Sequence, residues 1–434
     1  MKMEKVEAGA MDRSSVNYAW RILVLLTLGW MIAYVDRISM SAALADKAFI
    51  HEFGLTSIER GWLGSAVFWA YAVVQLPMGW LVDRYGVKWP YAICFTLWCI
   101  AAAATGMADT LTHLVLLRIA IGVTEAVVIP ASYRYIANAF DESRKGMATG
   151  IFSLGGKMGP AIGASVAAWL IATYSWKAMF VVTGCVGLLW LLPWLLMARN
   201  DFPSKEQLAV AKHRAASVPL RNLLASPVVW GGLLMTFCYS YFVFYSATWM
   251  PAYLVEQRGL SLKESGFYTF LSFTCVAVVA VGAAWAADRL IKRGGDAVKV
   301  RKGFVVAGSL GGMTIVFGAY ADSQQAALFW NVASLALAGL GTANNLALSK
   351  LTLIPKSAIG LNTGLLTIST SLAGGVSASL AGWLLHVGGS YAWPMVSVCI
   401  FLVIGAVSCV TLMRREWAPK VNESIPEIAA RTAV

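Results

Sequence analysis

The chain has 434 residues, of which 59% are hydrophobic and 13% charged, and its mean hydropathy is +0.67. Soluble domains carry about 25% charged residues, so this composition excludes a soluble protein and predicts an integral membrane protein. The net charge of +12 does not indicate a nucleic-acid partner, because Lys and Arg flank apolar runs and do not gather on a soluble face or motif.

Apolar stretches of about 20 residues recur along the whole chain, too long for the strands of a membrane barrel and without their alternation. The fold class is therefore an all-α integral membrane protein with twelve transmembrane helices. We expect these helices at residues 20–42, 58–82, 89–107, 111–138, 147–173, 177–198, 228–255, 265–289, 303–320, 326–349, 358–385 and 391–413.

The longest polar segment lies between the sixth and seventh helices and divides the chain into two halves. It predicts an N-terminal six-helix half over 1–198, a cytoplasmic linker over 199–226 and a C-terminal six-helix half over 227–434. Of the 34 Lys and Arg residues, twenty-five lie in the tails and loops of one side, five on the other and four within helices. This bias predicts a multi-pass protein with both termini in the cytoplasm.

A short sequence repeat supports the two-half organisation. The motif GWLVDR ends the second helix at 79–84, and AWAADR ends the eighth at 284–289, 205 positions later. Repeated halves are typical of secondary transporters, which bind their substrate near the midplane between the halves.

The loop after the second helix resembles the loop signature of the major facilitator superfamily, and with twelve helices the resemblance covers essentially the whole chain. The resemblance implies the major facilitator fold and gives this loop the role of a cytoplasmic conformational latch, not of a substrate site. A solvated basic turn is the alternative. The residues that match are Gly79, Asp83, Arg84, Gly86 and Lys88.

Charged residues within the predicted helices belong to the first half: Asp36, Arg37, Arg118, Glu125, Arg134 and Lys157. A charge at a helix centre costs about 2.5–3.5 kcal/mol on the insertion scale, so it needs a partner or a water-filled cavity. Arg118 and Glu125, seven residues apart, share a helix face. For Asp36 and Arg37 the alternative is that they lie at a helix end and extend into the interface.

These six charges sum to +2, which predicts an anionic small-molecule substrate. If Arg134 and Lys157 reach water at the helix ends, two neutral pairs remain instead, so their contact with substrate stays open. Because the second half has no comparable buried charge, we expect it to contribute neutral polar and aromatic groups. The candidates are Tyr241, Tyr245, Asn344, Asn345, Thr367 and Ser371.

An exchange of charge partners would couple this anion to protons. If Arg37 binds the substrate carboxylate through its planar guanidinium, the acids lose a partner and become free to take protons. We therefore expect Asp36 and Glu125 to be the proton sites, with Arg118 as their counter-ion. A permanent ion-pair network that only sets helix packing is the alternative.

Four motifs together resemble the anion:cation symporter family, which includes proton-coupled transporters of galactonate and hexuronates. They are YxDR at 34–37, Arg118 with Glu125, FWAYxxxQxP at 68–77 and WxPxYL at 249–254. The resemblance implies protonation of the acids at 36 and 125 and a substrate carboxylate on the Arg at 37. It also implies that the Arg at 118 pairs with the acids and that Tyr34 and Tyr71 line the site.

The chain departs from the sugar-acid pattern at three positions. Those relatives usually carry Asn where Thr367 and Ser371 align, and they rarely carry a charge where Lys157 lies. An added cation would suit a second acidic group, as in a dicarboxylate or an aldarate. Fewer amide groups would suit a less hydroxylated acid, including an aromatic one.

The sequence thus predicts a proton-coupled symporter that imports an organic carboxylate, a sugar acid, aldarate or related small acid, by alternating access. The alternatives are an aromatic-acid or dicarboxylate symporter and a proton-driven drug exporter. The net positive charge within the predicted helices argues against the exporter. No HExxH, GxSxG or GxxxxGK[ST] motif is present, which excludes the corresponding enzymes. We expect no metal and no cofactor beyond the proton, a bacterial inner membrane and a functional monomer.

Overall fold

The computed structural model describes residues 13–201, 220–355 and 358–419, so most of the predicted linker and both tail ends lie outside it. The described residues form helices and no strand, and all twelve predicted helices are present. The first half contains α1 (Arg13–Ala43), α2 (Lys47–Phe53), α3 (Ser57–Tyr85), α4 (Lys88–Thr105), α5 (Leu111–Glu125), α6 (Val128–Ala139), α7 (Glu142–Thr173), α8 (Trp176–Leu189) and α9 (Leu191–Met197).

The second half repeats this arrangement of long helices. It contains α11 (Leu220–Leu224), α12 (Pro227–Thr248), α13 (Met250–Glu256), α14 (Leu262–Lys292), α15 (Ala297–Gly312), α16 (Ile315–Tyr320), α17 (Gln324–Ala347), the π-helical η1 (Leu348–Thr352), α18 (Ile359–Gly388), α19 (Ala392–Leu412) and the 3-10 turn η3 (Arg415–Trp417).

Ten helical segments of the described chain are long and apolar enough to cross a bilayer. The two remaining long helices, α4 and α7, pack within the same bundle, α4 against α8 and α7 against α1. The chain is an all-α multi-pass membrane protein with the predicted number of long helices.

Three of the predicted transmembrane helices are each interrupted and form two helical segments, and a proline explains each interruption. Pro130, Pro193 and Pro251 each lie two to four residues beyond a break. Proline has no N–H, and its ring clashes with the carbonyl four residues earlier, so the helix is interrupted just before it. The break before Pro130 falls immediately after Glu125, one of the predicted proton sites.

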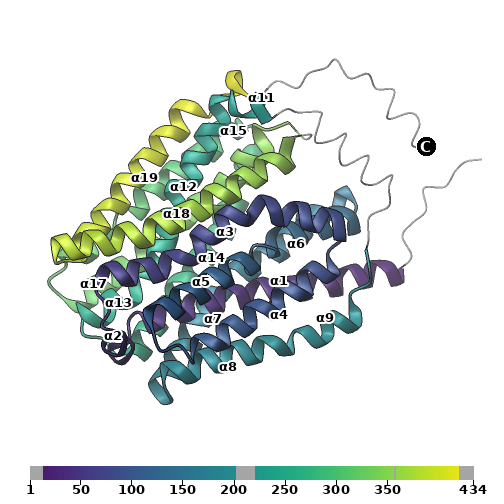
Figure 1. Cartoon of the computed structure of the whole chain (residues 1–434). Helices are drawn as coiled ribbons and strands as arrows, with labels where there is room; N and C mark the ends of the chain where they lie inside the picture. Colours follow the sequence, from purple (N-terminus) through teal and green to yellow (C-terminus); the bar gives the residue numbers. More distant parts are fainter. Residues whose placement is uncertain (1–12, 202–219, 356–357, 420–434) are drawn as a thin grey trace, which may run out of the picture.

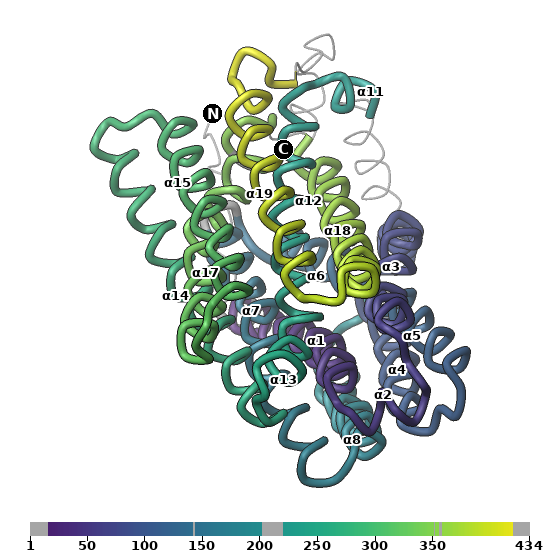
Figure 2. Tube along the Cα trace, turned by 90° about the vertical axis from the view of Figure 1, so that its left-hand side faces the viewer, coloured from purple at the N-terminus to yellow at the C-terminus, as the bar shows by residue number. Residues whose placement is uncertain are grey.

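The two halves meet chiefly along four helices. In Figure 1, α12, α18 and α19 lie above α1, α4 and α8. Figure 2 shows α3 beside α18 and α7 beside α14, and these two pairs make the main contacts between the halves. The first half has an aromatic core around Phe95, Trp98 and Trp190, whereas Tyr245 and Trp249 belong to the core of the second.

The structure extends the sequence repeat along the whole of α3 and α14. A capping box begins each helix, formed by Thr56 with Glu59 and by Ser261 with Glu264, again 205 positions apart. Near the other end, Arg84 lies 5.6 Å from the ring of Trp80, and Arg289 lies 5.3 Å from that of Trp285. The two helices are therefore equivalent elements of the two halves.

Glycines bring the halves into close contact at one end of the bundle, which we call the closed end. It is the end where α1 finishes and α3 begins. A Cβ added to Gly61 of α3 would lie 2.9 Å from the carbonyl oxygen of Ala378 in α18. A Cβ added to Gly266 of α14 would lie 2.9 Å from the carbonyl oxygen of Ala164 in α7. These two glycines are also 205 positions apart.

At the opposite end, which we call the open end, the same helix faces are separated. Gly79 lies on the face of α3 that holds Gly61, five full turns away, and a Cβ there would meet no described atom within 4 Å. Gly364 of α18 has the same relation to Gly382, and it too meets nothing within 4 Å. At the end where α1 starts and α19 finishes, these two glycines thus have no close neighbour, whereas their counterparts at the closed end touch the opposite half.

Candidate functional site

Four of the predicted site residues are buried together inside the first half. Asp36, Arg37, Arg118 and Glu125 are 3%, 9%, 2% and 0% exposed. Asp36 and Arg37 lie within α1, seven and six residues before its end, and are covered by other helices. The alternative in which they extend into the membrane interface is therefore wrong.

Arg37 is bound to Glu125 and surrounded by aromatic rings. Its Nε donates to Oε2 of Glu125 at 2.7 Å, joining α1 to α5. The guanidinium carbon lies between 5.1 and 5.9 Å from the ring centroids of Trp30, Tyr34, Phe68 and Tyr71. An arginine can stack on such rings and still donate hydrogen bonds in its own plane.

Several polar atoms of this cluster have no hydrogen-bond partner among the described residues. They are Nη2 of Arg37, Nε and Nη1 of Arg118, Oε1 of Glu125 and Oδ1 of Asp36. The expected pairing of Arg118 with the acids is thus not a hydrogen-bonded ion pair here, although Oε1 of Glu125 and Oδ1 of Asp36 are both without a partner. Three guanidinium nitrogens can still donate to an anion.

One carboxylate oxygen of Asp36 is directed toward α4 and not toward Arg37. Successive helical residues point about 100° apart, so the neighbours Asp36 and Arg37 reach different helices. Oδ2 of Asp36 accepts a hydrogen bond from Nε1 of Trp98 at 2.8 Å, and Trp98 is fully buried. Sequence reasoning missed Trp98, since nothing in an apolar run indicates which Trp meets a carboxylate.

A narrow cavity lies next to the charged cluster and between the halves. The first half contributes Tyr34, Arg37, Phe68 and Arg118, and the second half contributes Phe244, Ala247 and Thr248 of α12. Both arginines that have free N–H groups therefore border a space that belongs to the two halves together.

The two remaining charges of the first half have different surroundings. Arg134 donates to Asp83 at 2.9 Å, with 15% and 67% of the two side chains exposed, so the alternative that Arg134 leaves the central site holds. Lys157 is partly exposed on α7. It lies one turn before Ala161 and two before Ala164, on the face that meets α14. Lys157 thus borders the interface between the halves.

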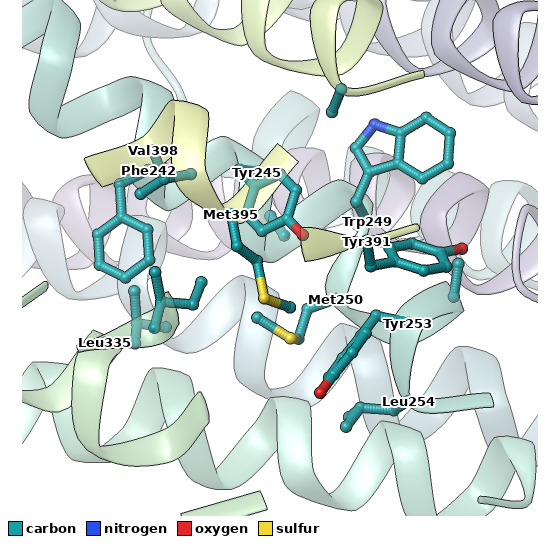
Figure 3. Close-up of a cluster of buried hydrophobic side chains, with 14 of the residues drawn as sticks. Phe242, Tyr245, Trp249, Met250, Tyr253, Leu254, Leu335, Tyr391, Met395 and Val398 are labelled. Atoms are coloured by element: carbon teal, nitrogen blue, oxygen red, sulfur yellow. The ribbon is translucent and has the colours of Figure 1, made fainter. Parts of the chain in front are cut away.

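The neutral candidates of the second half contact their own half. Tyr241 shares a hydrogen bond with Ser397 at 2.8 Å, and Tyr245 is buried among Met395 and Trp249 (Figure 3). The amide nitrogens of Asn344 and Asn345 donate to Leu340 and Thr236. Thr367 and Ser371 donate to carbonyls one turn earlier in α18. The structure does not bring any of these six to the cavity beside Arg37.

Among the described residues, the charged side chains that are fully buried belong to the first half, as expected, whereas two cations of the second half are partly buried. The tenth predicted helix continues through η1, so Lys350 is within it and its Nζ lies 5.5 Å from the ring of Tyr133 in the first half. Arg301 of α15 pairs with Asp288 at 2.9 Å. The sequence placed both cations in loops because helix ends are hard to position by hydropathy.

The predicted latch loop is held by an acid that sequence analysis had placed in the linker. Oδ1 of Asp201 accepts hydrogen bonds from the backbone N–H groups of Val87 at 2.8 Å and Lys88 at 3.3 Å, at the start of α4. A carboxylate is favourable at a helix N-terminus. Gly86 turns the chain there with a φ of 78°, and a side chain would collide with Asp201.

A partly buried ion pair joins the two halves at the closed end, and sequence analysis missed it as well. Nη2 of Arg60 lies 2.7 Å from Oε1 of Glu256 and donates to the carbonyl oxygen of Leu44 at 2.7 Å. The hydroxyl of Tyr391 donates to the other carboxylate oxygen of Glu256, and the Arg60 guanidinium lies 5.2 Å from the Trp249 ring. We call Arg60, Glu256 and Tyr391 the closed-end clamp.

Among the described residues, no three His, Cys, Asp or Glu side chains gather as a metal site would require. A family model described as Major Facilitator Superfamily matches residues 26–353. The chain belongs to the major facilitator superfamily.

Three similar proteins are named as transporters, or probable transporters, of organic acids. A D-galactonate transporter of Escherichia coli is 28% identical over 90% of this chain and 94% of that protein. A probable galactarate/D-glucarate transporter of Bacillus subtilis is 28% identical, covering 94% and 96% of the two chains. A probable sulfoacetate transporter of Cupriavidus necator is 28% identical, covering 89% and 92%.

Solved structures agree on the fold. A bacterial homolog of the human lysosomal transporter Spinster, in an inward-facing and occupied conformation, matches with a TM-score of 0.75 at 17% identity over 94% of this chain and 99% of that one. A D-xylose-proton symporter matches with a TM-score of 0.71 at 16% identity over 93% and 100%. The chain is a transporter of the superfamily and not an enzyme, as its sequence predicted.

Proposed function

We propose that the chain imports an organic carboxylate together with protons by alternating access. The main support is Arg37, which borders the cavity between the halves while its Nε binds the buried Glu125. A substrate carboxylate that binds the Arg37 guanidinium in place of Glu125 would leave Glu125 free to accept a proton. The site thus links anion and proton through one side chain.

Under this proposal Asp36 and Glu125 carry protons and Arg37 binds the substrate carboxylate. Arg118 adds two unpartnered nitrogens at the same cavity and is the second candidate for the anion. Tyr34 and Tyr71 complete the aromatic surroundings. The substrate is a sugar acid, aldarate or related acid, in keeping with the names of the galactonate, galactarate/glucarate and sulfoacetate relatives.

A drug exporter is the weaker alternative. Such a transporter would need an uncompensated acid in its cavity, whereas Asp36 and Glu125 are accompanied by two arginines. Dicarboxylate and aromatic-acid symport remain variants of the main proposal, and Lys157 is the residue that would favour the former. We place the protein in a bacterial inner membrane as a monomer, with the open end and both termini in the cytoplasm.

Uptake into proteoliposomes under an inward proton gradient tests this proposal. The panel contains sugar acids, aldarates, small dicarboxylates, a sulfonated acid and aromatic acids. We expect gradient-driven accumulation of at least one acid. Accumulation that does not respond to the gradient would rule out proton symport.

The Glu125→Gln variant tests the coupling acid separately. Glutamine keeps the size of the side chain but cannot take up a proton reversibly. We expect gradient-driven accumulation to be lost while counterflow exchange of the same acid persists. Accumulation that survives the substitution would show that Glu125 is not the coupling acid.

A further inference from the structure

We propose that Trp98 is the positioning residue for proton binding at Asp36. In this proposal its indole N–H holds Oδ2 of Asp36 and leaves Oδ1 as the oxygen that takes the proton. The inference rests on the proposed function, in which Asp36 carries a proton. It adds a residue and an atom that the proposed function does not specify.

The hydrogen-bond chemistry of indole carries this assignment. Nε1 of Trp98 donates to Oδ2 at 2.8 Å, while Oδ1 is buried and has no partner among the described residues. An indole N–H is a donor only, so it cannot accept a hydrogen bond from a protonated oxygen. A proton on Oδ2 would leave the Trp98 N–H with a hydroxyl oxygen, the weaker acceptor, whereas a proton on Oδ1 leaves Oδ2 as a carbonyl oxygen that still accepts this hydrogen bond.

The aromatic core of the first half fixes the position of Trp98. Its ring packs 4.2 Å from that of Phe95, and Phe95 packs 4.2 Å from Trp190. Trp190 stacks in turn on Trp194 at 5.1 Å. All four side chains are buried, so the indole of Trp98 cannot turn away unless the core repacks.

Other ionisable groups act on Asp36 but do not replace this hydrogen bond. Arg37 is the next residue on the same helix. Arg118 and Glu125 of α5 and Cys99 of α4 are near enough to interact with the charge of Asp36. Arg37 is engaged with Glu125. In the part of the chain that the structure describes, Trp98 is the hydrogen-bond donor to Asp36.

Trp190 provides a matched control from the same aromatic core. Its Nε1 donates to the backbone carbonyl oxygen of Leu25 at 2.8 Å, on the same helix α1 that carries Asp36. Trp98→Phe and Trp190→Phe therefore remove the same kind of donor and a similar ring volume. Only the first substitution removes a donor to a carboxylate.

The test follows the protonated carboxyl of Asp36 in the full-length protein by infrared spectroscopy over a pH series. The C=O band of this group is assigned by its loss in Asp36→Asn. A donor to the charged carboxylate favours the unprotonated form, so its removal makes protonation easier. We expect Trp98→Phe to move the midpoint of the band about 1–2 pH units higher, and Trp190→Phe to leave it unchanged.

The pH profile of gradient-driven uptake should shift in the same direction in Trp98→Phe. If that variant does not fold, 3-benzothienylalanine at position 98 keeps the ring shape and removes the N–H. Equal midpoints in the Trp98 and Trp190 variants would overturn the inference while leaving proton symport intact. A wild-type Asp36 that never titrates, with uptake independent of the gradient, would overturn both.

Discussion

Arg37 makes two kinds of contact that a lysine could not combine. Its Nε makes a directional bond with Glu125 at 2.7 Å, and the flat guanidinium lies against four aromatic rings. An ammonium group is not planar, so it cannot stack on aromatic rings and also donate two parallel hydrogen bonds to one carboxylate. Charge alone therefore does not define this site.

The Arg37→Lys variant tests this distinction at the residue scale. We expect the affinity for the transported acid to fall tenfold or more, because a charge-assisted hydrogen bond contributes about 1.5–3 kcal/mol. Competition for counterflow in proteoliposomes measures the affinity. Arg199→Lys is the control, since Arg199 also stacks on a tyrosine, Tyr18 at 4.5 Å, but at an exposed position. Equal affinities in wild type and Arg37→Lys would contradict the role of the guanidinium.

At the scale of elements, the closed-end clamp links the ends of four helices. Arg60 begins α3, Glu256 ends α13, Tyr391 precedes α19 and the acceptor carbonyl of Leu44 follows α1. The side chains of Arg60 and Glu256 are 6% and 28% exposed, so water screens this pair only in part. The clamp must separate before the cavity can open at this end.

The Arg60→Gln variant should therefore favour opening at the closed end. We expect the loss of this charged pair to cost the closed state about 1–3 kcal/mol. The measurement is the reaction of a single cysteine at Ala247, which lines the cavity, with an impermeant maleimide applied from the closed-end side, in a background without the native cysteines.

Lys177→Gln is the matched control for the clamp. Lys177 pairs with Glu52 at 2.7 Å at the same end, but both side chains are exposed and both belong to the first half. The hydrogen bond from Lys177 holds the pKa of Glu52 below its usual range. The pair therefore persists at neutral pH and is lost as the pH falls through the lowered pKa of Glu52. A faster reaction in Lys177→Gln than in Arg60→Gln would refute the clamp.

At the scale of the whole molecule, the repeat explains how the bundle closes at one end. Gly61 and Gly266 occupy equivalent positions in the two halves, and each lets its helix approach the opposite half. The symmetry that relates the two halves also relates these two contacts. Both contacts must therefore separate when the bundle opens at the closed end.

Gly266→Ala tests this symmetric closure. Its Cβ would lie 2.6 Å from Cβ of Ala168, and we expect this overpacking to cost the closed state about 1–3 kcal/mol. Spin labels at His51 and Gln257, exposed at the closed end in different halves, report the separation by pulsed electron resonance. Gly282→Ala on the same helix meets no described atom and should leave the distances unchanged. Equal distances between the spin labels in Gly266→Ala and Gly282→Ala would contradict symmetric closure.

The sequence by itself determined the features that depend on the bilayer. The number of long helices, their approximate bounds and the charged residues of the first half follow from the cost of placing polar groups in hydrocarbon. Asp36, Arg37, Arg118 and Glu125 were identified this way, and the structure gathers them in one buried cluster. The latch motif and the repeat were visible because they are local in the chain.

Only the tertiary structure decided which groups meet. Arg37 and Glu125 are 88 residues apart, and Asp36 and Trp98 are 62 apart, so no local pattern records either contact. Arg60 and Glu256 lie near predicted helix ends, and only the packing of the halves brings them together as an ion pair. Hydropathy reports how each segment partitions into the membrane, whereas contacts between helices depend on side-chain shape and on the symmetry of the two halves.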